Sequence, residues 1–269
     1  MSVSQGLKAT HLDLQIDGKV ILADINIELQ PGKLLAVIGP NGAGKTSLLK
    51  MLSGQIKTQG QVSWRGHALN HLSQMQLAQQ IAVVNQLNDH VFALNLQQIV
   101  RMGLLPYKTL LSQDSNDDIQ RIDDAIARVG LADKHQQRFS SLSGGEQQRG
   151  LIARALVQQA ALIILDEPVN HLDVFYQHQV LSLLRNLAHQ TNITVVMSLH
   201  DLNLTANYCD EICLLDQGRV HAQGDAETVL KADILQQVFH LPNVVRRDEI
   251  SNNLRVDFYP LQSSEEPHA

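Results

Sequence analysis

Gly39-Pro40-Asn41-Gly42-Ala43-Gly44-Lys45-Thr46 is the stretch that decides the fold, because it fits the pattern G-x-x-x-x-G-K-[ST] of a phosphate-binding loop. A continuous apolar run, Leu34 to Ile38, precedes it and is typical of a strand buried on both faces. Behind it, Leu48, Leu49 and Leu52 recur at helical spacing. Strand, loop and helix in this order are the context that an incidental glycine-rich turn would lack.

The residue types of this loop suit a nucleoside triphosphate. Glycines let the main chain curl so that amide groups reach phosphate oxygens, and the following helix N-terminus adds positive potential. We expect Lys45 to contact the β- and γ-phosphates and Thr46 to place its hydroxyl on Mg²⁺. The expected nucleotide-binding residues are Gly39, Pro40, Asn41, Gly42, Ala43, Gly44, Lys45, Thr46 and the adjoining Ser47.

Two carboxylates end a second apolar run. Asp166 and Glu167 follow Leu162 to Leu165, and carboxylates at the carboxyl end of a parallel strand point into the ligand crevice of an open α/β sheet. We expect Asp166 to hold Mg²⁺, in part through water, and Glu167 to act as the general base or to orient the attacking water. The alternative, two solvated charges at a strand end, is disfavoured by the following Pro168 and by the phosphate loop upstream.

A third segment, Leu142 to Arg149 (LSGGEQQR), has the pattern of a helix start. Ser143 fits an N-cap, and Glu146 three residues later completes a capping box. A helix N-terminus that carries Gly144 and Gly145 also exposes amide groups suited to a phosphate. The segment can therefore be both a capped helix start and a phosphate-binding site, because the two interpretations use the same geometry.

Two single residues complete the series: Gln86 follows the strand pattern 81–85, and His200 follows the apolar run 193–199. An isolated glutamine after a strand is usually a surface residue, and a lone histidine is more often structural than catalytic. The order and content of the five signals, however, resemble the nucleotide-binding subunits of ATP-binding-cassette (ABC) transporters over nearly the whole chain. The segment 142–149 matches the family's LSGGEQQR at every place.

The resemblance implies an α/β fold: a P-loop NTPase cassette whose RecA-like core carries an antiparallel β subdomain and a helical subdomain. It implies ATP and Mg²⁺ as cofactors. Gln86 resembles the Q-loop glutamine that contacts Mg²⁺ or water, and His200 the switch histidine that contacts the γ-phosphate. The catalytic residues are then Glu167, His200 and Gln86, and the metal site comprises Thr46, Gln86 and Asp166.

The resemblance further implies an active site split between two molecules. Ser143, Gly144 and Gly145 would complete the site in trans, against ATP held by the partner copy. Residues 170–173 (Asn-His-Leu-Asp) resemble the D-loop at the seam of that homodimer. At one position the chain departs from the family: Ile16 and Asp17 stand before Gly18, where many members have an aromatic residue that stacks on adenine.

The periodicities give a coarse map of the chain. Apolar and polar residues alternate from His11 to Gln30 around a turn at Asp17-Gly18, as in an antiparallel hairpin. We expect a polar loop at 113–118, a helix over 119–129 ended by Gly130, and weak periodicity beyond Pro242. The expected parts are 1–86 (first part of the core), 87–159 (helical subdomain), 160–241 (second part of the core) and 242–269 (extension with a polar tail).

Composition narrows the class of protein. The 269 residues include 27 acidic and 21 basic ones, and a net charge of −6 argues against a nucleic-acid partner. The sequence contains no stretch of about 18 or more apolar residues, so we expect no segment that spans a bilayer. The N-terminus lacks the pattern of a signal peptide. We expect a cytoplasmic location. Cys209 and Cys213 fit small apolar residues better than a metal pair.

Local motifs indicate the kind of ABC protein. Residues 100–107, 170–173 and 200–204 resemble importers for iron chelates (ferric siderophore or haem) and cobalamin. This implies integral membrane permease subunits, indirectly a periplasmic binding protein, and a peripheral place on the inner face of the cell membrane. The alternatives are a cobalamin importer, a non-transport ABC ATPase such as an iron–sulfur assembly scaffold or a translation factor, and an exporter subunit.

Overall fold

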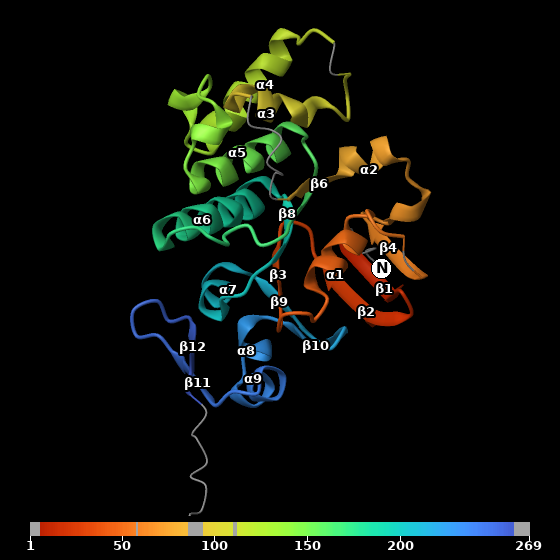
Figure 1. Ribbon diagram of the computed structural model, residues 1–269, viewed down its shortest axis with the longest axis vertical. Coiled ribbons are helices and arrows are strands. Elements are labelled where there is room, and N and C mark those ends of the chain that lie inside the picture. The colour runs from red at the N-terminus through yellow and green to blue at the C-terminus, as the bar shows by residue number, and fades with distance from the viewer. Residues whose placement is uncertain (1–5, 58, 86–93, 110–111, 261–269) are drawn as a thin grey trace, which may run out of the picture.

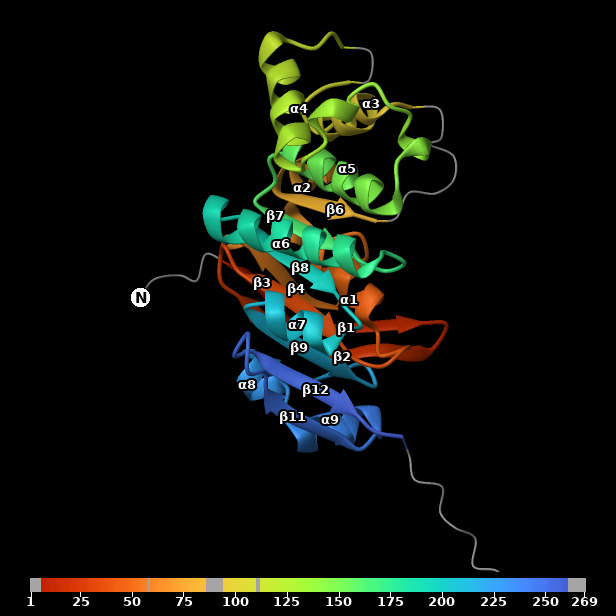
Figure 2. The same cartoon turned by 90° about the vertical axis from the view of Figure 1, so that its left-hand side faces the viewer.

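The computed structural model describes residues 6–57, 59–85, 94–109 and 112–260. A six-stranded sheet forms the middle of the molecule, and an antiparallel sheet lies beside it (Figure 1). The helices α3, α4 and α5 gather at one end of the long axis, and the C-terminal elements lie at the other (Figures 1 and 2). This is the α/β cassette that the sequence predicts.

The antiparallel sheet begins with the predicted hairpin. Strand β1 (Leu7–Ile16) pairs with β2 (Lys19–Leu29), and the order β2-β1-β4-β5 adds β4 (Gln59–Trp64) and β5 (His67–Ala68). At the turn, Asp17 and Gly18 have φ of 50° and 77°. Positive φ at both central residues marks the turn type whose twist matches that of the flanking strands.

The central sheet has the order β10-β9-β3-β8-β7-β6. All of its strands run parallel except β10, which is antiparallel to β9. Parallel strands share one carboxyl edge, where ligands of open α/β sheets bind. The strands are β3 (Leu34–Ile38), β6 (Ile81–Val84), β7 (Leu162–Leu165), β8 (Thr194–Ser198), β9 (Glu211–Asp216) and β10 (Arg219–Gly224).

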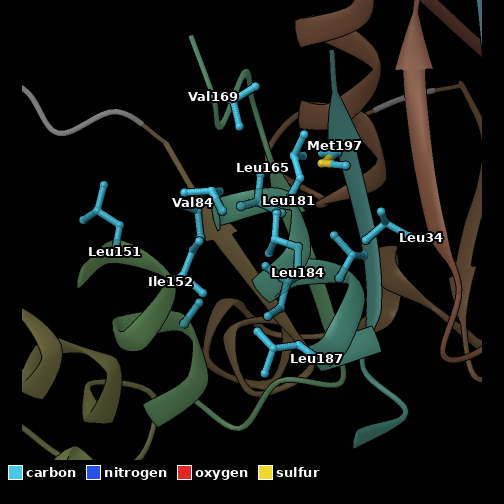
Figure 3. Close-up of a cluster of buried hydrophobic side chains, with 14 of the residues drawn as sticks. Leu34, Val84, Leu151, Ile152, Leu165, Val169, Leu181, Leu184, Leu187 and Met197 are labelled. Atoms are coloured by element: carbon cyan, nitrogen blue, oxygen red, sulfur yellow. The ribbon is translucent and has the colours of Figure 1, made fainter. Parts of the chain in front are cut away.

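Both faces of this sheet are covered, which explains its continuous apolar runs. Along β3, Leu35 and Val37 face a cluster with α1 (Lys45–Leu52), whereas Leu34, Ala36 and Ile38 face the opposite cluster. The second cluster is filled by α6 (Val174–Thr191), an 18-residue helix that the sequence patterns did not identify, and by α5 (Gly144–Val157). Figure 3 shows leucines of α6 pointing at β7 and β8.

The helical part begins after β6. Its helices are α3 (Leu96–Arg101), α4 (Asn116–Arg128) and α5, and α2 (Gln74–Gln80) precedes β6. Short 3₁₀ turns lie before α2 (Leu69–His71), after α3 (Met102–Leu104), and between α4 and α5 (Ala132–Lys134 and Phe139–Ser141).

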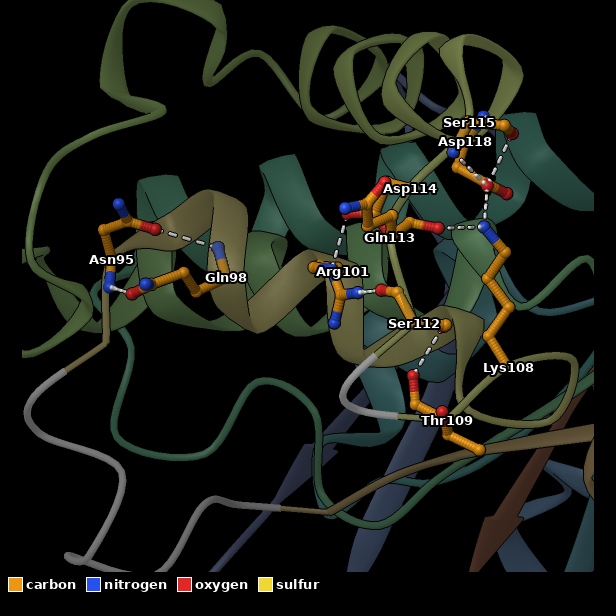
Figure 4. A network of polar contacts seen from close by, with 10 residues as sticks. All are labelled: Asn95, Gln98, Arg101, Lys108, Thr109, Ser112, Gln113, Asp114, Ser115 and Asp118. Atoms are coloured by element: carbon orange, nitrogen blue, oxygen red, sulfur yellow. Dashed lines mark hydrogen bonds and ion pairs between the residues drawn. The ribbon is translucent and has the colours of Figure 1, made fainter.

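The predicted start of α4 is wrong by three residues. The loop expected at 113–118 contains the first helical turn, because Ser115 and Asp118 form a capping box there. Asp118 also pairs with Lys108, and Arg101 Nε lies 2.5 Å from Asp114 Oδ2 (Figure 4). These polar contacts order a stretch whose composition is typical of a loop. Gly130, with φ of 71°, follows the helix end as predicted.

The region beyond Pro242, for which the periodicity of the sequence is weak, forms an antiparallel pair of strands, β11 (Asn243–Arg247) and β12 (Leu254–Phe258). It follows α7 (Leu202–Tyr208), α8 (Ala226–Val229) and α9 (Ala232–Phe239) along the chain. Strand β12 alternates apolar and polar residues as a strand pattern requires, whereas in β11 two adjacent valines precede two arginines and the alternation is absent. The predicted polar tail 263–269 lies outside the described residues.

Two predictions from composition can be compared with the structure. Cys213 is fully buried in β9, where burial raises its pKa to about 12, and burial also raises the pKa of the Cys209 thiol. Within the described ranges, no group of three or more His, Cys, Asp or Glu residues is arranged to hold a metal ion. Among those same residues, no helix is both long and apolar enough to cross a bilayer.

Candidate active site

The phosphate-loop sequence links β3 to α1 at the carboxyl edge of the central sheet. Gly39 and Gly44 have φ of 146° and 102°. A Cβ on Gly39 would lie 2.2 Å from the carbonyl oxygen of Leu215, and one on Gly44 would lie 2.7 Å from Leu22 Cδ2. The loop therefore needs glycine for both its conformation and its space, as the sequence pattern requires.

Lys45 is the buried cation of the loop, with 7% of its surface exposed. Its ammonium donates hydrogen bonds to the carbonyl oxygens of Gly39 (2.8 Å) and Pro40 (3.1 Å). Burial lowers the pKa of Lys45, while the charges of Glu167 and Asp166 act in the opposite direction. The loop thus holds a cation next to two carboxylates, and these two bonds use two of its three donors.

These features fit a triphosphate with Mg²⁺. A glycine cradle and the N-terminus of the eight-residue α1 offer main-chain amide groups, and Lys45 offers positive charge. Thr46 is exposed on the first turn of α1, and Ser47 is half-buried beside it. Hydroxyl and carboxylate oxygens are the ligands that Mg²⁺ prefers.

The two carboxylates stand at the end of β7, as predicted, and a serine joins them. Ser198 Oγ donates to Asp166 Oδ1 at 2.6 Å and accepts from the main-chain N–H of Glu167 at 2.8 Å. Ser198 is fully buried at the end of β8. Sequence reasoning missed it, although a polar residue that ends an apolar strand was the available signal.

Glu167 is bonded through both carboxylate oxygens. His200 Nε2 lies 2.6 Å from Oε1, and Asn170 Nδ2 donates to Oε2. The main chain of Glu167 has φ of 50°, a left-handed conformation that is uncommon for a residue with a side chain. The structure therefore brings together Glu167 and His200, two of the three residues predicted to be catalytic, and adds Asn170 to them.

The third residue, Gln86, lies outside the described residues. Strand β6 ends two residues before it, where Val84 pairs with Leu165, next to the carboxylates. Its role remains a prediction.

The segment 142–149 starts α5, and its capping box is confirmed. The Ser143 N–H donates to Glu146 Oε2 at 2.8 Å, and the Glu146 N–H donates to Ser143 Oγ at 3.4 Å. A Cβ on Gly145 would lie 2.7 Å from Cγ of Tyr176, so α5 begins tight against α6. In the part of the chain that is described, no hydrogen bond joins Ser143, Gly144 or Gly145 to the loop 39–47.

The hairpin that lacks an aromatic residue offers aliphatic carbon instead. Ile16 and Val20, on either side of the Asp17-Gly18 turn, are 47% and 53% exposed. The side chain of Leu22, farther along β2, packs against Gly44 of the loop. This strand therefore runs from the phosphate loop towards a small exposed apolar surface.

Comparison with known proteins gives consistent matches. The sequence model of the family described as ABC transporter matches residues 22–170. The chain is 38% identical over 259 residues to the cobalamin import ATP-binding protein of Halobacterium salinarum. That match covers 96% of this chain but only 65% of the relative's length. The chain is also 37% identical to the hemin import ATP-binding protein of Methylobacillus flagellatus, over 89% of this chain and 91% of that one.

A solved structure gives the same result for the fold. The chain superimposes with a TM-score of 0.83 on an inward-facing transporter assigned to the metal-chelate type of ABC transporters. The two share 30% identity, and the match covers 96% of this chain and 98% of the other.

Proposed function

The chain belongs to the ABC transporter family, and we propose that it is the ATP-hydrolysing subunit of a bacterial importer of an iron chelate, either ferric siderophore or haem. Cobalamin is the second candidate cargo, because a cobalamin import protein is among the relatives of similar identity. The observation that supports hydrolysis best is the meeting of Lys45, Asp166, Glu167 and His200 at one edge of the sheet.

In the proposed reaction, the loop 39–47 binds the phosphates of ATP through its amide groups and Lys45. Mg²⁺, held by Thr46, Asp166 and Gln86 and in part through water, would neutralise charge on the phosphates. Ser198 fixes Asp166 and the main chain of Glu167 relative to each other. In this proposal the two adjacent carboxylates have separate roles: Asp166 holds Mg²⁺, and Glu167 acts on the attacking water.

Glu167 receives the proton of the attacking water. A general base must be oriented as well as ionised, and bonds from His200 and Asn170 fix its carboxylate plane. His200 has a second role in this proposal, since it contacts the γ-phosphate once ATP is bound. Gln86 contacts the metal or its water.

The site is completed by a second copy of the chain. Ser143, Gly144 and Gly145 present the N-terminus of α5, a 14-residue helix, to the γ-phosphate bound by the partner. Two copies then enclose two ATP molecules. The closing and reopening of this homodimer drives the conformational change of the membrane subunits. The division into 1–86, 87–159, 160–241 and 242–269 is part of this proposal.

The proposed partners are integral membrane permease subunits and, through them, a periplasmic binding protein. The proposed place is the inner face of the cell membrane. A non-transport ABC ATPase, such as an iron–sulfur assembly scaffold, is the alternative of another class. Co-purification separates the two, because only the transport subunit would bring down a protein with many apolar spans.

The function is tested on the purified full-length chain and in cells. We expect MgATP hydrolysis that is lost in Lys45→Ala but kept in Lys50→Ala, a lysine exposed in the last turn of the same helix. A deletion strain should then lose uptake of haem, ferric siderophore or cobalamin, each measured separately. Equal activity of the two lysine variants, or normal uptake of all three compounds, would contradict the proposal.

A further inference from the structure

The C-terminal hairpin, residues 243–258, packs against the helix that follows the switch-like histidine. Strand β12 lies beside α7 (Figure 2). Val256 of β12 is 4% exposed and belongs to the same buried cluster as Leu202 and Leu204 of α7. The hairpin is therefore part of the core on this side and is fixed against α7.

Asn203 joins the two elements through both ends of its side-chain amide. Asn203 Nδ2 donates to the carbonyl oxygen of Val256 at 3.1 Å, and the Val256 N–H donates to Asn203 Oδ1 at 2.8 Å. An asparagine carries one acceptor and one donor group, and here both serve the main chain of one residue. This pairing imitates a neighbouring strand along the edge of β12.

The same asparagine is bonded to the residue next to His200. Asp201 caps α7, and its Oδ1 accepts from the N–H groups of Asn203 (2.7 Å) and Leu204 (2.9 Å). A continuous series of hydrogen bonds thus runs from Val256 through Asn203 to Asp201. His200 stands at the end of this series.

The position of His200 depends on its flanking main chain. Its side chain is 38% exposed and makes one hydrogen bond in the described structure, to Glu167. Upstream, the chain is held by β8 and by the bond from the Leu199 N–H to the Val37 carbonyl oxygen at 3.1 Å. Downstream, the support comes from the cap of α7 and from Asn203.

We propose that Asn203 is a positioning residue, which ties the C-terminal hairpin to the His200 loop and so sets the rate of ATP hydrolysis from outside the nucleotide site. The inference rests on the proposed function, because it assumes that His200 acts in hydrolysis. The C-terminal hairpin then has a defined role, since it holds the downstream side of the histidine loop in register with Glu167.

The test uses the full-length chain with Asn203→Ala, and Asn207→Ala as the matched control. Asn207 lies one turn farther along α7 and also bonds the hairpin, since Asn253 Nδ2 donates to its Oδ1 at 3.0 Å. We expect Asn203→Ala to lower kcat by about 10-fold to about 100-fold, the range for a small misplacement of a catalytic group. The KM for ATP should stay within about twofold, since the phosphate loop is untouched. Asn207→Ala should keep the wild-type kcat.

A double-mutant cycle separates positioning from a general loss of structure. If Asn203 acts through His200, the variant with both Asn203→Ala and His200→Ala is no slower than His200→Ala alone. The proposal would be overturned if the double variant lost as much activity as the two single variants combined, or if Asn203→Ala kept the wild-type kcat. If Asn203→Ala does not fold, Asn203→Asp decides by the same cycle, because it keeps the acceptor for the Val256 N–H.

The wild-type chain distinguishes the two levels of failure. If the wild type hydrolyses ATP and Asn203→Ala does so at the same rate, only this inference is overturned. A wild type no more active than Lys45→Ala overturns the proposed function itself.

Discussion

His200 Nε2 lies 2.6 Å from Glu167 Oε1, so the candidate base and the switch-like histidine are hydrogen-bonded to each other. They come from the ends of neighbouring parallel strands, β8 and β7. The arrangement gives Glu167 a fixed orientation before any nucleotide is considered. It also means that a change at either residue alters the environment of the other.

Replacing Glu167 by glutamine tests the base directly. Glutamine keeps the size of the side chain and an acceptor for His200 or Asn170, but it cannot take a proton from water. We expect turnover to fall by about 10²-fold to about 10⁴-fold, the usual contribution of a general base. ATP binding should remain, and ATP should now stabilise a dimer. The measurements are phosphate release and size-exclusion chromatography with ATP.

The control for this variant is Glu227→Gln, an exposed carboxylate paired with Arg247. It should hydrolyse ATP like the wild type. If Glu167→Gln also hydrolyses ATP at the wild-type rate, Glu167 is not the base.

The contact between α5 and α6 predicts a difference between two adjacent glycines. A Cβ on Gly145 would lie 2.7 Å and 2.8 Å from ring atoms of Tyr176, whereas a Cβ on Gly144 would meet only Leu172 Cδ2, at 3.3 Å. Gly145→Ala should therefore lower the free energy of unfolding by about 1–3 kcal/mol, as overpacking does. Gly144→Ala should cost nothing, because alanine favours the helix. Urea unfolding of both variants measures this, and equal stabilities would show that Tyr176 moves aside freely.

The phosphate loop and the carboxylates at 166–167 could be predicted from the sequence because their signals are local. A strand, a glycine loop and a helix follow one another between Leu34 and Leu52, and the pattern fixes the conformation within that stretch. The hairpin around Asp17-Gly18 was predicted for the same reason, since two residues define its turn. Each of these predictions needs no knowledge of distant segments.

The sequence marks Ser198 as a polar residue that ends an apolar strand, but the roles of Ser198 and Asn203 could not be predicted, because they depend on which segments become neighbours. Ser198 meets Asp166 only because β7 and β8 are adjacent in the sheet, an order that no local pattern reveals. Asn203 meets Val256 across 53 residues of chain. Helix α6 is a different case, because its buried residues Val180, Leu181, Leu184, Leu187 and Ala188 recur at helical spacing, so the signal for this helix was present in the sequence.

The buried carboxylate of Asp118 predicts a pH dependence of stability. Hydrogen bonds from Lys108 and Ser115 hold the pKa of Asp118 well below its ordinary value of 3.8. As the pH falls below that value, the unfolded chain binds a proton that the folded chain resists, so the stabilisation present at neutral pH is lost in acid.

We expect Asp118→Asn to lower the free energy of unfolding by about 1–3 kcal/mol near pH 7, the loss typical of hydrogen bonds to a charged group. The difference from the wild type should shrink as the pH falls through about 4 towards about 3. Asp124→Asn, at an exposed position on the same helix, serves as the control and should change little. Urea unfolding at several pH values measures both variants. If the difference in the free energy of unfolding between the wild type and Asp118→Asn stays constant with pH, the lowered pKa of Asp118 is contradicted.

The split site makes the strongest prediction, because two inactive variants should repair each other. Ser143→Arg places a bulky cation at the start of α5 and leaves Lys45 and its loop unchanged, yet we expect it to block hydrolysis. Lys45→Ala is expected to be inactive for the opposite reason, with an intact α5. A two-fold symmetric dimer has two equivalent sites, each built from the loop of one copy and α5 of the other. Random pairing makes about half of the dimers mixed, and each mixed dimer has one intact site out of two, so about a quarter of the wild-type sites are restored.

The restored sites arise only in mixed dimers, where the intact loop of one copy faces the intact α5 of the other. Mixing the two purified variants and measuring phosphate release against total protein therefore distinguishes a site in trans from a site within one chain. If Ser143→Arg alone is as active as the wild type, then Ser143 takes no part in hydrolysis, and the case for a shared site is lost.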